Sequence, residues 1–356
     1  MLRILPGLGL AIALAFAGQL LSHVIGIQIL DLPKSPISAT MVAIILGLVL
    51  RNTIGVSERF APGVSFGLKR VLRVGIVLLG IRLSVAQIGE LGLQALPIIL
   101  GTVLTALVVV TFLAKRIGVN SRLGTLIAVG TSVCGSTAIV ATAPAIGARD
   151  DEVCYAVACI TLFGLLAMLI YPFAGHLLFS GDAVAVGLFL GTAVHDTAQV
   201  AGSGLVYQQF YGDASALDAA TVTKLVRNLG MLIIIPAMSI FYHRQGQGDE
   251  KAPAWWTMVP LFVIGFALMS LLRTLGDAST PAFGVLSGEL WQQVVHTIQS
   301  IATLALTVAM ASVGLGTDIG EIRRIGLKPL GIGLLSALIV GVVSFALLTF
   351  TAGVLR

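Results

Sequence analysis

The stretches GTSVCGSTAIVA (Gly130–Ala141) and GTAVHDTAQVA (Gly191–Ala201) place small and polar residues inside long apolar segments. Both begin with Gly-Thr-x-Val. Glycine and clustered hydroxyl residues weaken a helix, and such breaks persist at membrane depth only inside protein or beside a wet cavity. A His-Asp pair at that depth is a functional-site candidate by default. We therefore predict two interrupted helices that approach each other near the membrane midplane, as in many secondary transporters.

The composition is that of a membrane protein. Of 356 residues, 57% are hydrophobic and 10% charged, and the mean hydropathy is +1.03. Soluble domains carry about 25% charged residues, so we predict an all-α polytopic membrane protein, with residues 1–356 forming one integral membrane domain in the lipid bilayer. The net charge of +5 comes without a soluble basic domain, so no nucleic-acid partner is expected. Cys134, Cys154 and Cys159 lack metal or redox spacing and are expected to be free thiols; no cofactor or metal is expected.

Ten or eleven hydrophobic segments are candidates for transmembrane helices, each of which needs about 20 residues. The eleven segments are 3–22, 37–50, 71–87, 95–114, 124–146, 153–175, 184–205, 218–242, 256–274, 296–317 and 329–352. The second is short for a span, and we expect it to be tilted, interfacial or partly re-entrant.

Basic residues are distributed unequally between alternate loops. With the N terminus in the cytoplasm, the N-terminal tail and the even-numbered loops hold fourteen Lys and Arg residues. The odd-numbered loops and the C-terminal tail hold Lys34, Arg149, Arg273 and Arg356. Positive residues concentrate in short cytoplasmic loops, which predicts a cytoplasmic N terminus, a periplasmic C terminus and an odd number of spans. The three remaining basic residues, Arg82, Lys224 and Arg227, fall within spans or at their edges.

Residues 74–100 align without a gap to 308–334, so that Gly80 meets Gly314 and Gly92 meets Gly326. The two segments are seven spans apart and hence opposite in orientation, as an inverted-topology repeat requires. The alternative is coincidence between two Gly- and Leu-rich helices. The Gly-Thr-x-Val echo fits less well, because those segments lie two spans apart and would share one orientation unless one of them is re-entrant.

Three clusters carry the candidate chemistry, and the first is the break at 130–137. It contains Thr131, Ser132, Cys134, Gly135, Ser136 and Thr137. An unwound segment here would expose a helix N terminus, whose free N–H groups and partial positive charge suit an anion. The alternative is close helix packing, because small residues also line transmembrane interfaces.

The second cluster is His195, Asp196, Thr197 and Gln199. His195 and Gln199 are four residues apart and could share a helix face. Histidine titrates near neutral pH and can carry protons, which favours a coupling or gating role over a purely structural ion pair. One His and one Asp are too few ligands for a metal site.

The third cluster is Lys224, Arg227 and Asn228. Its two cations could neutralise an anionic substrate, pair with Asp196, or extend to the membrane interface. An ionised Asp196 at this depth needs a cation, so we predict that His195, Asp196, Lys224 and Arg227 form one charge-coupled group facing the Ser132–Thr137 break. Arg82 and Asp318 occupy nearby positions of the long repeat, and each is a candidate partner in a gating ion pair.

The motifs also resemble a known family. SVCGSTAIVATAP at 132–144, GTAVHDTAQV at 191–200, TKLVRN at 223–228, RVGIVLLGIRLS at 73–84 and AMASVGLGTDI at 309–319 are similar, in the same order, to the YeiH-like family of sulfate exporters. The resemblance covers nearly the whole chain. It implies a bacterial inner-membrane protein of ten or eleven helices, with the inverted repeats and broken crossing helices of antiporter-like and bile-acid-symporter-like folds.

The leading hypothesis is a secondary transporter that moves a small inorganic or organic anion by alternating access, and the resemblance suggests sulfate. Ser132, Ser136 and Thr137 would bind oxygens, and Lys224 and Arg227 would supply positive charge. No P-loop sequence is present, so a proton or sodium gradient, or the substrate's own gradient, is the expected energy source. The alternatives are a cation/proton antiporter that uses Asp196, a passive anion channel, and, least favoured, an intramembrane enzyme that uses His195 and Asp196 with a serine or with Cys134. A homodimer is compatible with the sequence.

Overall fold

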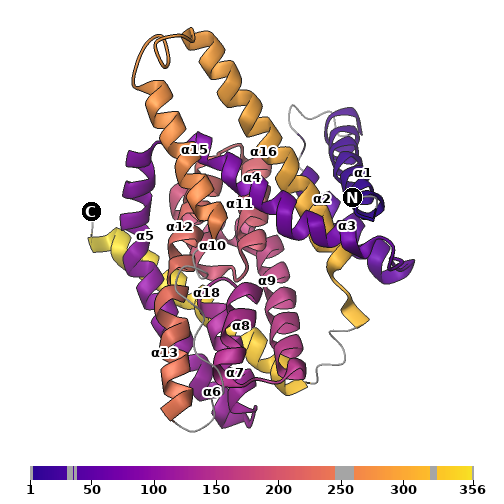
Figure 1. The fold of residues 1–356 in the computed structure, drawn as a ribbon, viewed down its shortest axis with the longest axis vertical. Coiled ribbons are helices and arrows are strands. Elements are labelled where there is room, and N and C mark those ends of the chain that lie inside the picture. Colours follow the sequence, from indigo (N-terminus) through magenta and orange to yellow (C-terminus); the bar gives the residue numbers. More distant parts are fainter. Residues whose placement is uncertain (1–2, 30–34, 36–37, 245–259, 321–326, 355–356) are drawn as a thin grey trace. The chain divides into compact units, whose positions relative to one another are not determined.

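The described part of the chain is helical. The computed structural model describes residues 3–29, 35, 38–244, 260–320 and 327–354. In chain order the elements are α1 (Leu5–His23), η1 (Val24–Ile29), α2 (Ala39–Thr53), α3 (Ala61–Phe66), η2 (Gly67–Val71), α4 (Leu72–Leu79), η3 (Gly80–Arg82), α5 (Val85–Thr105), η4 (Ala106–Val110), α6 (Thr111–Ile117), α7 (Ser121–Ser132), α8 (Ser136–Thr142), η5 (Pro144–Ile146), α9 (Asp150–Leu178), α10 (Ala183–Ala193), α11 (Thr197–Tyr211), α12 (Ser215–Leu229), α13 (Met231–Arg244), α15 (Leu261–Asp277), α16 (Gly288–Gly316) and α18 (Leu327–Val354) (Figure 1). The all-α class predicted from the composition is confirmed.

Six of these helical stretches are long and apolar enough to cross a bilayer, which takes about 20 residues. They are Leu5–His23, Val85–Ile117, Asp150–Leu178, Ser215–Tyr242, Gly288–Gly316 and Leu327–Thr351. The stretch Ser215–Tyr242 joins α12 to α13 through Gly230, whose carbonyl still accepts a hydrogen bond from Ile234 N at 2.9 Å. It is therefore one span with an irregular turn in its middle.

Contacts divide the chain into two compact units. The first comprises Met1–Glu90, Ala201–Asp218 and Leu261–Asp318. Its helices approach closely through small residues, as is typical of membrane proteins. A Cβ added to Gly47 of α2 would lie 2.7 Å from Ala311 O of α16, and one added to Gly18 of α1 would lie 2.6 Å from Ala39 O of α2. Larger side chains at these two glycines would force the helices apart.

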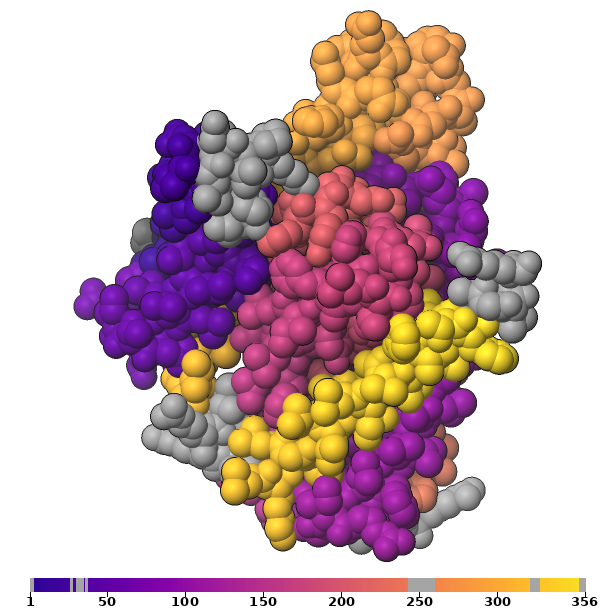
Figure 2. All heavy atoms as spheres, turned by 180° about the vertical axis from the view of Figure 1, so that it is seen from behind, coloured from indigo at the N-terminus to yellow at the C-terminus, as the bar shows by residue number. Residues whose placement is uncertain are grey.

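The second unit comprises Leu91–Val200, Ala219–Pro260 and Ile319–Arg356. Figure 2 shows α18, in yellow, lying diagonally over other helices of this unit. Within this unit α18 packs on α9 and α10, and Ser344 of α18 lies 2.5 Å, oxygen to oxygen, from Thr192 of α10. Leu338 and Val342 of α18 are 51% and 65% exposed, which is the apolar exterior that lipid contact requires.

In the second unit, α7 and α8 form a helical hairpin. Near the start of α7, Thr125 Oγ1 lies 2.8 Å from the hydroxyl of Tyr242 at the end of α13. Ile146, after α8, shares a core cluster with that same tyrosine. The turn between the helices lies at the other end of α13, where Cys134 Sγ is 3.3 Å from Met231 Sδ. The start of α7 and the residues after α8 therefore both lie beside the C-terminal end of α13, so the chain from α7 to α8 turns back on itself.

Helices α10 and α11 form a second hairpin. Helix α10 follows α9 and packs against its last turns, with the rings of Tyr171 and Phe189 5.1 Å apart. The chain turns at Val194–Asp196, and α11 then runs along α12, because Thr197 Oγ1 accepts from Asn228 Nδ2 at 3.2 Å. Residues 212–214 join the end of α11 to the start of α12. The span Ser215–Tyr242 continues from there to the base of the first hairpin, so the two hairpins reach its middle from opposite ends.

This arrangement explains the Gly-Thr-x-Val echo. Two of the eleven expected segments, 124–146 and 184–205, form hairpins instead of continuous helices, and α9 runs between them, so the hairpins are inverted relative to each other. The breaks predicted at 130–137 and 191–199 are confirmed. The longer repeat of 74–100 with 308–334 stays a prediction; each segment leads from the first unit into the second, and residues 321–326 lie outside the described chain.

Candidate functional site

The tips of the two hairpins meet at Asp196. Its Oδ2 accepts a hydrogen bond from Ser136 Oγ at 2.9 Å and a longer one from Ser136 N at 3.4 Å, and its Oδ1 accepts from Ala198 N at 3.0 Å. The carboxylate thus lies at the first turn of both α8 and α11. Backbone N–H groups at helix starts have no partner within the helix and carry partial positive charge, so this position stabilises an anionic group.

Gly135 makes room for that carboxylate. It adopts a φ of +72°, a conformation that side chains with a Cβ rarely take, and a Cβ built on it would lie 2.7 Å from Asp196 Oδ2. Gly135 lies five residues after Gly130 in the first hairpin. Asp196 lies five residues after Gly191 in the second hairpin and therefore occupies the equivalent position. One carboxylate therefore serves the helix starts of both hairpins.

Two buried cations of α12, Lys224 and Arg227, bind the backbone carbonyl groups at the C-terminal ends of α7 and α10. Arg227 donates from Nε to Ser132 O at 2.7 Å and from Nη1 to Thr192 O at 2.7 Å, and its Nη2 bonds to Thr131 O. Its longer contacts reach Gly191 O and Val194 O. The guanidinium thereby neutralises the carbonyl ends of α7 and α10 together, where a helix carries partial negative charge.

Lys224 completes this set of bonds. Its Nζ donates to Val133 O at 2.8 Å and to Val194 O at 3.2 Å, and it also bonds to His195 O. Lys224 and Arg227 are 1% and 0% exposed, so their ammonium and guanidinium groups are satisfied almost entirely by backbone carbonyls of the two turns.

The structure differs in one respect from the predicted charge-coupled group of His195, Asp196, Lys224 and Arg227. Among the described residues, no cation lies within ion-pair distance of Asp196, and the two cations bond to carbonyls instead. The reason is that helix termini supply both kinds of partial charge. N–H groups and the Ser136 hydroxyl satisfy the carboxylate, and carbonyl groups satisfy Lys224 and Arg227.

Several buried polar atoms around the tips have no hydrogen-bond partner among the described residues. They are Thr131 Oγ1, both ring nitrogens of His195, Thr223 Oγ1 and Asn228 Oδ1. A buried polar atom without a partner costs about 1–3 kcal/mol, so such a cluster is typical of a place that takes up water or a polar ligand. Thr223 was not among the residues singled out from the sequence; its position one residue before Lys224 is the signal that could have indicated it.

Two of the remaining sequence candidates, Ser132 and Gln199, have defined hydrogen-bond partners. Ser132 donates its hydroxyl to Ala128 O at 2.5 Å within α7, and Thr137 is exposed. Gln199 accepts from Asp196 N at 3.1 Å and donates to Thr161 O at 3.0 Å. The expectation that His195 and Gln199 share a helix face is wrong, because α11 begins only at Thr197.

Arg82 and Asp318 lie in the first unit, and each forms an ion pair with a residue that the sequence did not indicate. Arg82 Nε is 2.6 Å from Asp218 Oδ1, and Arg51 Nη2 is 3.0 Å from Asp318 Oδ2. The two candidates are therefore members of separate ion pairs. No group of three or more His, Cys, Asp or Glu residues that could hold a metal ion occurs in the described ranges.

Comparison with known proteins places the chain in a family. The family model described as Conserved hypothetical protein 698 matches residues 6–333. A UPF0324 membrane protein of Streptococcus pyogenes serotype M18 is 35% identical over 350 residues, 97% of each chain. Another from Fusobacterium nucleatum is 31% identical, covering 88% of this chain and 89% of the relative. No solved structure matches. The helices, the coverage and the identity agree: this chain belongs to the UPF0324 family of membrane proteins.

Proposed function

We propose that this chain is a secondary transporter of a small anion and that the anion binds where the two hairpin tips meet, beside Ser136, Asp196 and Thr197. The observation that carries the proposal is the division of polar groups at the tips. The carbonyl oxygens of both turns are occupied by Lys224 and Arg227, whereas the donors of the α8 and α11 starts face a half-buried region. A ligand entering there meets donors, which suit an anion.

The balance of charge supports the same ligand. Two cations and one carboxylate lie around the tips, so the ionised cluster carries an excess of one positive charge. Buried in a membrane span, that excess favours a partner of negative charge. The unpartnered atoms of His195 and Asn228 add polar groups that an oxoanion and its water can satisfy.

Asp196 is then the group that couples transport to protons. Its carboxylate already accepts the hydrogen bonds that an entering anion would need from Ser136 and the α11 start. Protonation removes its charge and weakens its hold on those donors. The anion would therefore bind best with a proton on Asp196, and the two would move together.

The alternatives fit less well. A cation/proton antiporter would need oxygen ligands for the cation, and the carbonyls of both turns are already bonded to Lys224 and Arg227. An enzyme built on Cys134 would need its sulfur beside His195, yet the sulfur contacts Met231. A passive channel would give flux without saturation, which is an outcome of the test below.

The membrane orientation belongs to the same proposal. If both hairpins turn back, the loop holding Arg149 moves to the cytoplasmic side, and the loop between α9 and α10, which holds no Lys or Arg, moves to the periplasmic side. The excess of basic residues then rises from fourteen against four to fifteen against three, in better accord with the rule for cytoplasmic loops. We place the protein in the bacterial inner membrane, with a cytoplasmic N terminus and a periplasmic C terminus.

The test is uptake of radiolabelled anions by proteoliposomes holding the purified chain, with and without an imposed pH gradient. Sulfate, sulfite, phosphate, acetate and chloride form the panel, and liposomes without protein are the control. Saturable uptake of one anion that the pH gradient increases would support the proposal. Linear flux would identify a channel. Proton movement driven by sodium or potassium, with no anion uptake, would overturn the proposal in favour of an antiporter.

A further inference from the structure

The first unit contains a polar cavity whose lining shares no residue with the hairpin tips. It has a volume of about 290 Å³ and is lined by Gln19 of α1, Arg82 of η3, Gln208 of α11, and His296, Gln299, Ser300, Thr303 and Leu304 of α16. Seven of these eight side chains are polar. A water molecule occupies about 30 Å³ of liquid, so the space accommodates a small ion together with several waters.

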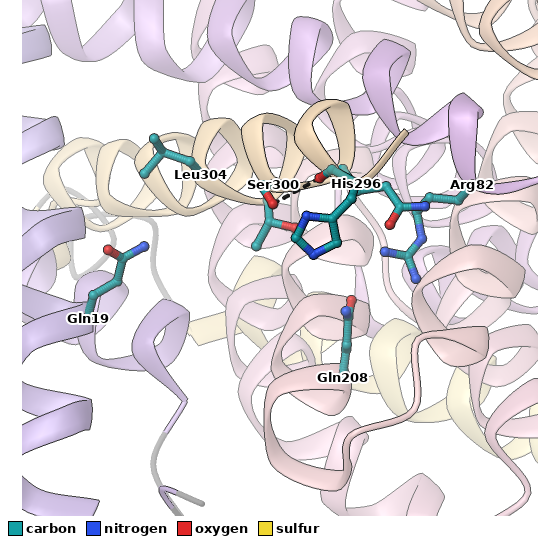
Figure 3. A pocket seen from close by; sticks show the side chains of 8 residues that line it. Gln19, Arg82, Gln208, His296, Ser300 and Leu304 are labelled. Carbon is teal, nitrogen blue, oxygen red and sulfur yellow. Dashed lines mark hydrogen bonds between the residues drawn. The ribbon is translucent and has the colours of Figure 1, made fainter. Parts of the chain in front are cut away.

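Helix α16 supplies most of the lining through a regular pattern. His296, Gln299, Ser300 and Thr303 follow one another at intervals of three, one and three residues, which places them on one face of the helix. Figure 3 shows the His296 ring and the Gln208 amide facing each other across the cavity, with the Arg82 guanidinium beside them. A polar face along a membrane helix is expensive in lipid and marks a functional surface.

The chemistry of the lining is rich in donors. Three amides, two hydroxyls, an imidazole and a guanidinium face the space, and none of the described lining residues is a carboxylate. Arg82 is fixed by Asp218, whose Oδ1 accepts from Nε at 2.6 Å, and this bond engages only one edge of the guanidinium. The other edge can bind two oxygens of one ligand, the geometry by which arginine recognises oxoanions.

A second observation points to an occupant. Gln208 Oε1 is buried and has no hydrogen-bond partner among the described residues. An acceptor beside an arginine is satisfied by water or by the hydroxyl of a protonated oxoanion. Both the donor-rich wall and this single acceptor suit a hydrated or singly protonated oxoanion.

We propose that this cavity is a second binding site for a small oxoanion, separate from the site at the hairpin tips. Arg82 binds two of its oxygens, and His296 and Gln299 donate to the others. Asp218 is a positioning residue that holds the guanidinium edge-on. The assignment does not depend on the anion being transported.

Binding can be followed through Trp291. This residue of α16 is 4% exposed and shares a core cluster with Ile81, the neighbour of Arg82. Replacing Trp255 and Trp256 by Phe leaves Trp291 as the single tryptophan. The purified full chain in lipid nanodiscs is titrated with sulfate, and glycerol at equal concentration serves as a neutral solute. A saturable fluorescence change with sulfate alone is expected.

Two sets of variants test the assignment. The pair Arg82→Gln with Asp218→Asn keeps an uncharged hydrogen bond in the wall, and His296→Leu with Gln299→Leu leaves the ion pair intact. Each should weaken sulfate binding at least about tenfold, because a hydrogen bond to a charged group is lost. The matched control is Arg51→Gln with Asp318→Asn, which neutralises another ion pair of the same unit away from the cavity.

The outcomes separate this site from the hairpin site. Ser136→Ala with Asn228→Ala should leave the Trp291 response unchanged, even if it abolishes transport. The proposal is overturned if sulfate does not change the Trp291 fluorescence of the chain whose cavity residues are unchanged. It is also overturned if glycerol gives the same response, or if the cavity variants and the Arg51→Gln control respond alike.

Discussion

The hydroxyl of Ser136 donates to the carboxylate of Asp196 over 2.9 Å and joins the tips of two helical hairpins that are 60 residues apart in sequence. The bond brings the start of α8 and the start of α11 to one carboxylate.

Asp196→Asn should leave the protein folded in the membrane but abolish the effect of a pH gradient on anion uptake. The amide keeps one acceptor oxygen, for either Ser136 or Ala198 N, and it cannot bind or release a proton near neutral pH. Uptake in proteoliposomes is measured at several imposed gradients, with the exposed Asp151→Asn as the control. Uptake that still responds to the gradient in Asp196→Asn would show that the proton is carried elsewhere.

Gly135→Ala should destabilise the hairpin contact. Alanine at a φ of +72° costs about 1–2 kcal/mol, and its Cβ would displace the Asp196 carboxylate. The matched control is Gly89→Ala on α5, where an added Cβ meets nothing within 4 Å. Thermal unfolding followed by size-exclusion chromatography should give a clearly lower midpoint for Gly135→Ala alone. Equal midpoints would mean that the tip adapts without strain.

Arg227→Met should be among the most destabilising single substitutions in the chain. It removes hydrogen bonds to carbonyls of both hairpins, and each buried carbonyl left without a partner costs about 1–3 kcal/mol. Arg227→Lys should recover only part of the loss, since an ammonium lacks the planar fork of five donors. Arg59→Met, at an exposed position, is the control. A stable Arg227→Met protein would refute the structural role of the guanidinium.

Cysteine labelling should place Lys115 and Arg149 on one side of the membrane and Ser180 and Ser215 on the other. All four are exposed, and each is changed to Cys in a chain whose three native cysteines are replaced. The reagent is membrane-impermeant and is applied to intact cells and to inverted vesicles. If 124–146 crossed the bilayer as one helix, Lys115 and Arg149 would be labelled from opposite sides.

The breaks themselves were predictable, because clustered Gly, Ser and Thr at 130–137 and 191–199 are unusual within apolar segments. Their reversal was not, since a helix that continues past a break and one that turns back have the same composition. Lys224 and Arg227 were predicted as site cations, but bonds to backbone carbonyls leave no pattern in the sequence. Asp218 could not be assigned to Arg82, because the two residues are 136 positions apart and nothing near either indicates the other.

Because Arg227 bonds to the turns of both hairpins, neither tip can open alone without breaking hydrogen bonds of the guanidinium. If the two tips shift together with α12, none of these bonds is broken. In the proposed transporter, the motion that exposes the site at the lowest cost is therefore displacement of the two tips together with the part of α12 that holds Arg227. Arg227 therefore couples the two tips, so that they move together and not as two independent gates.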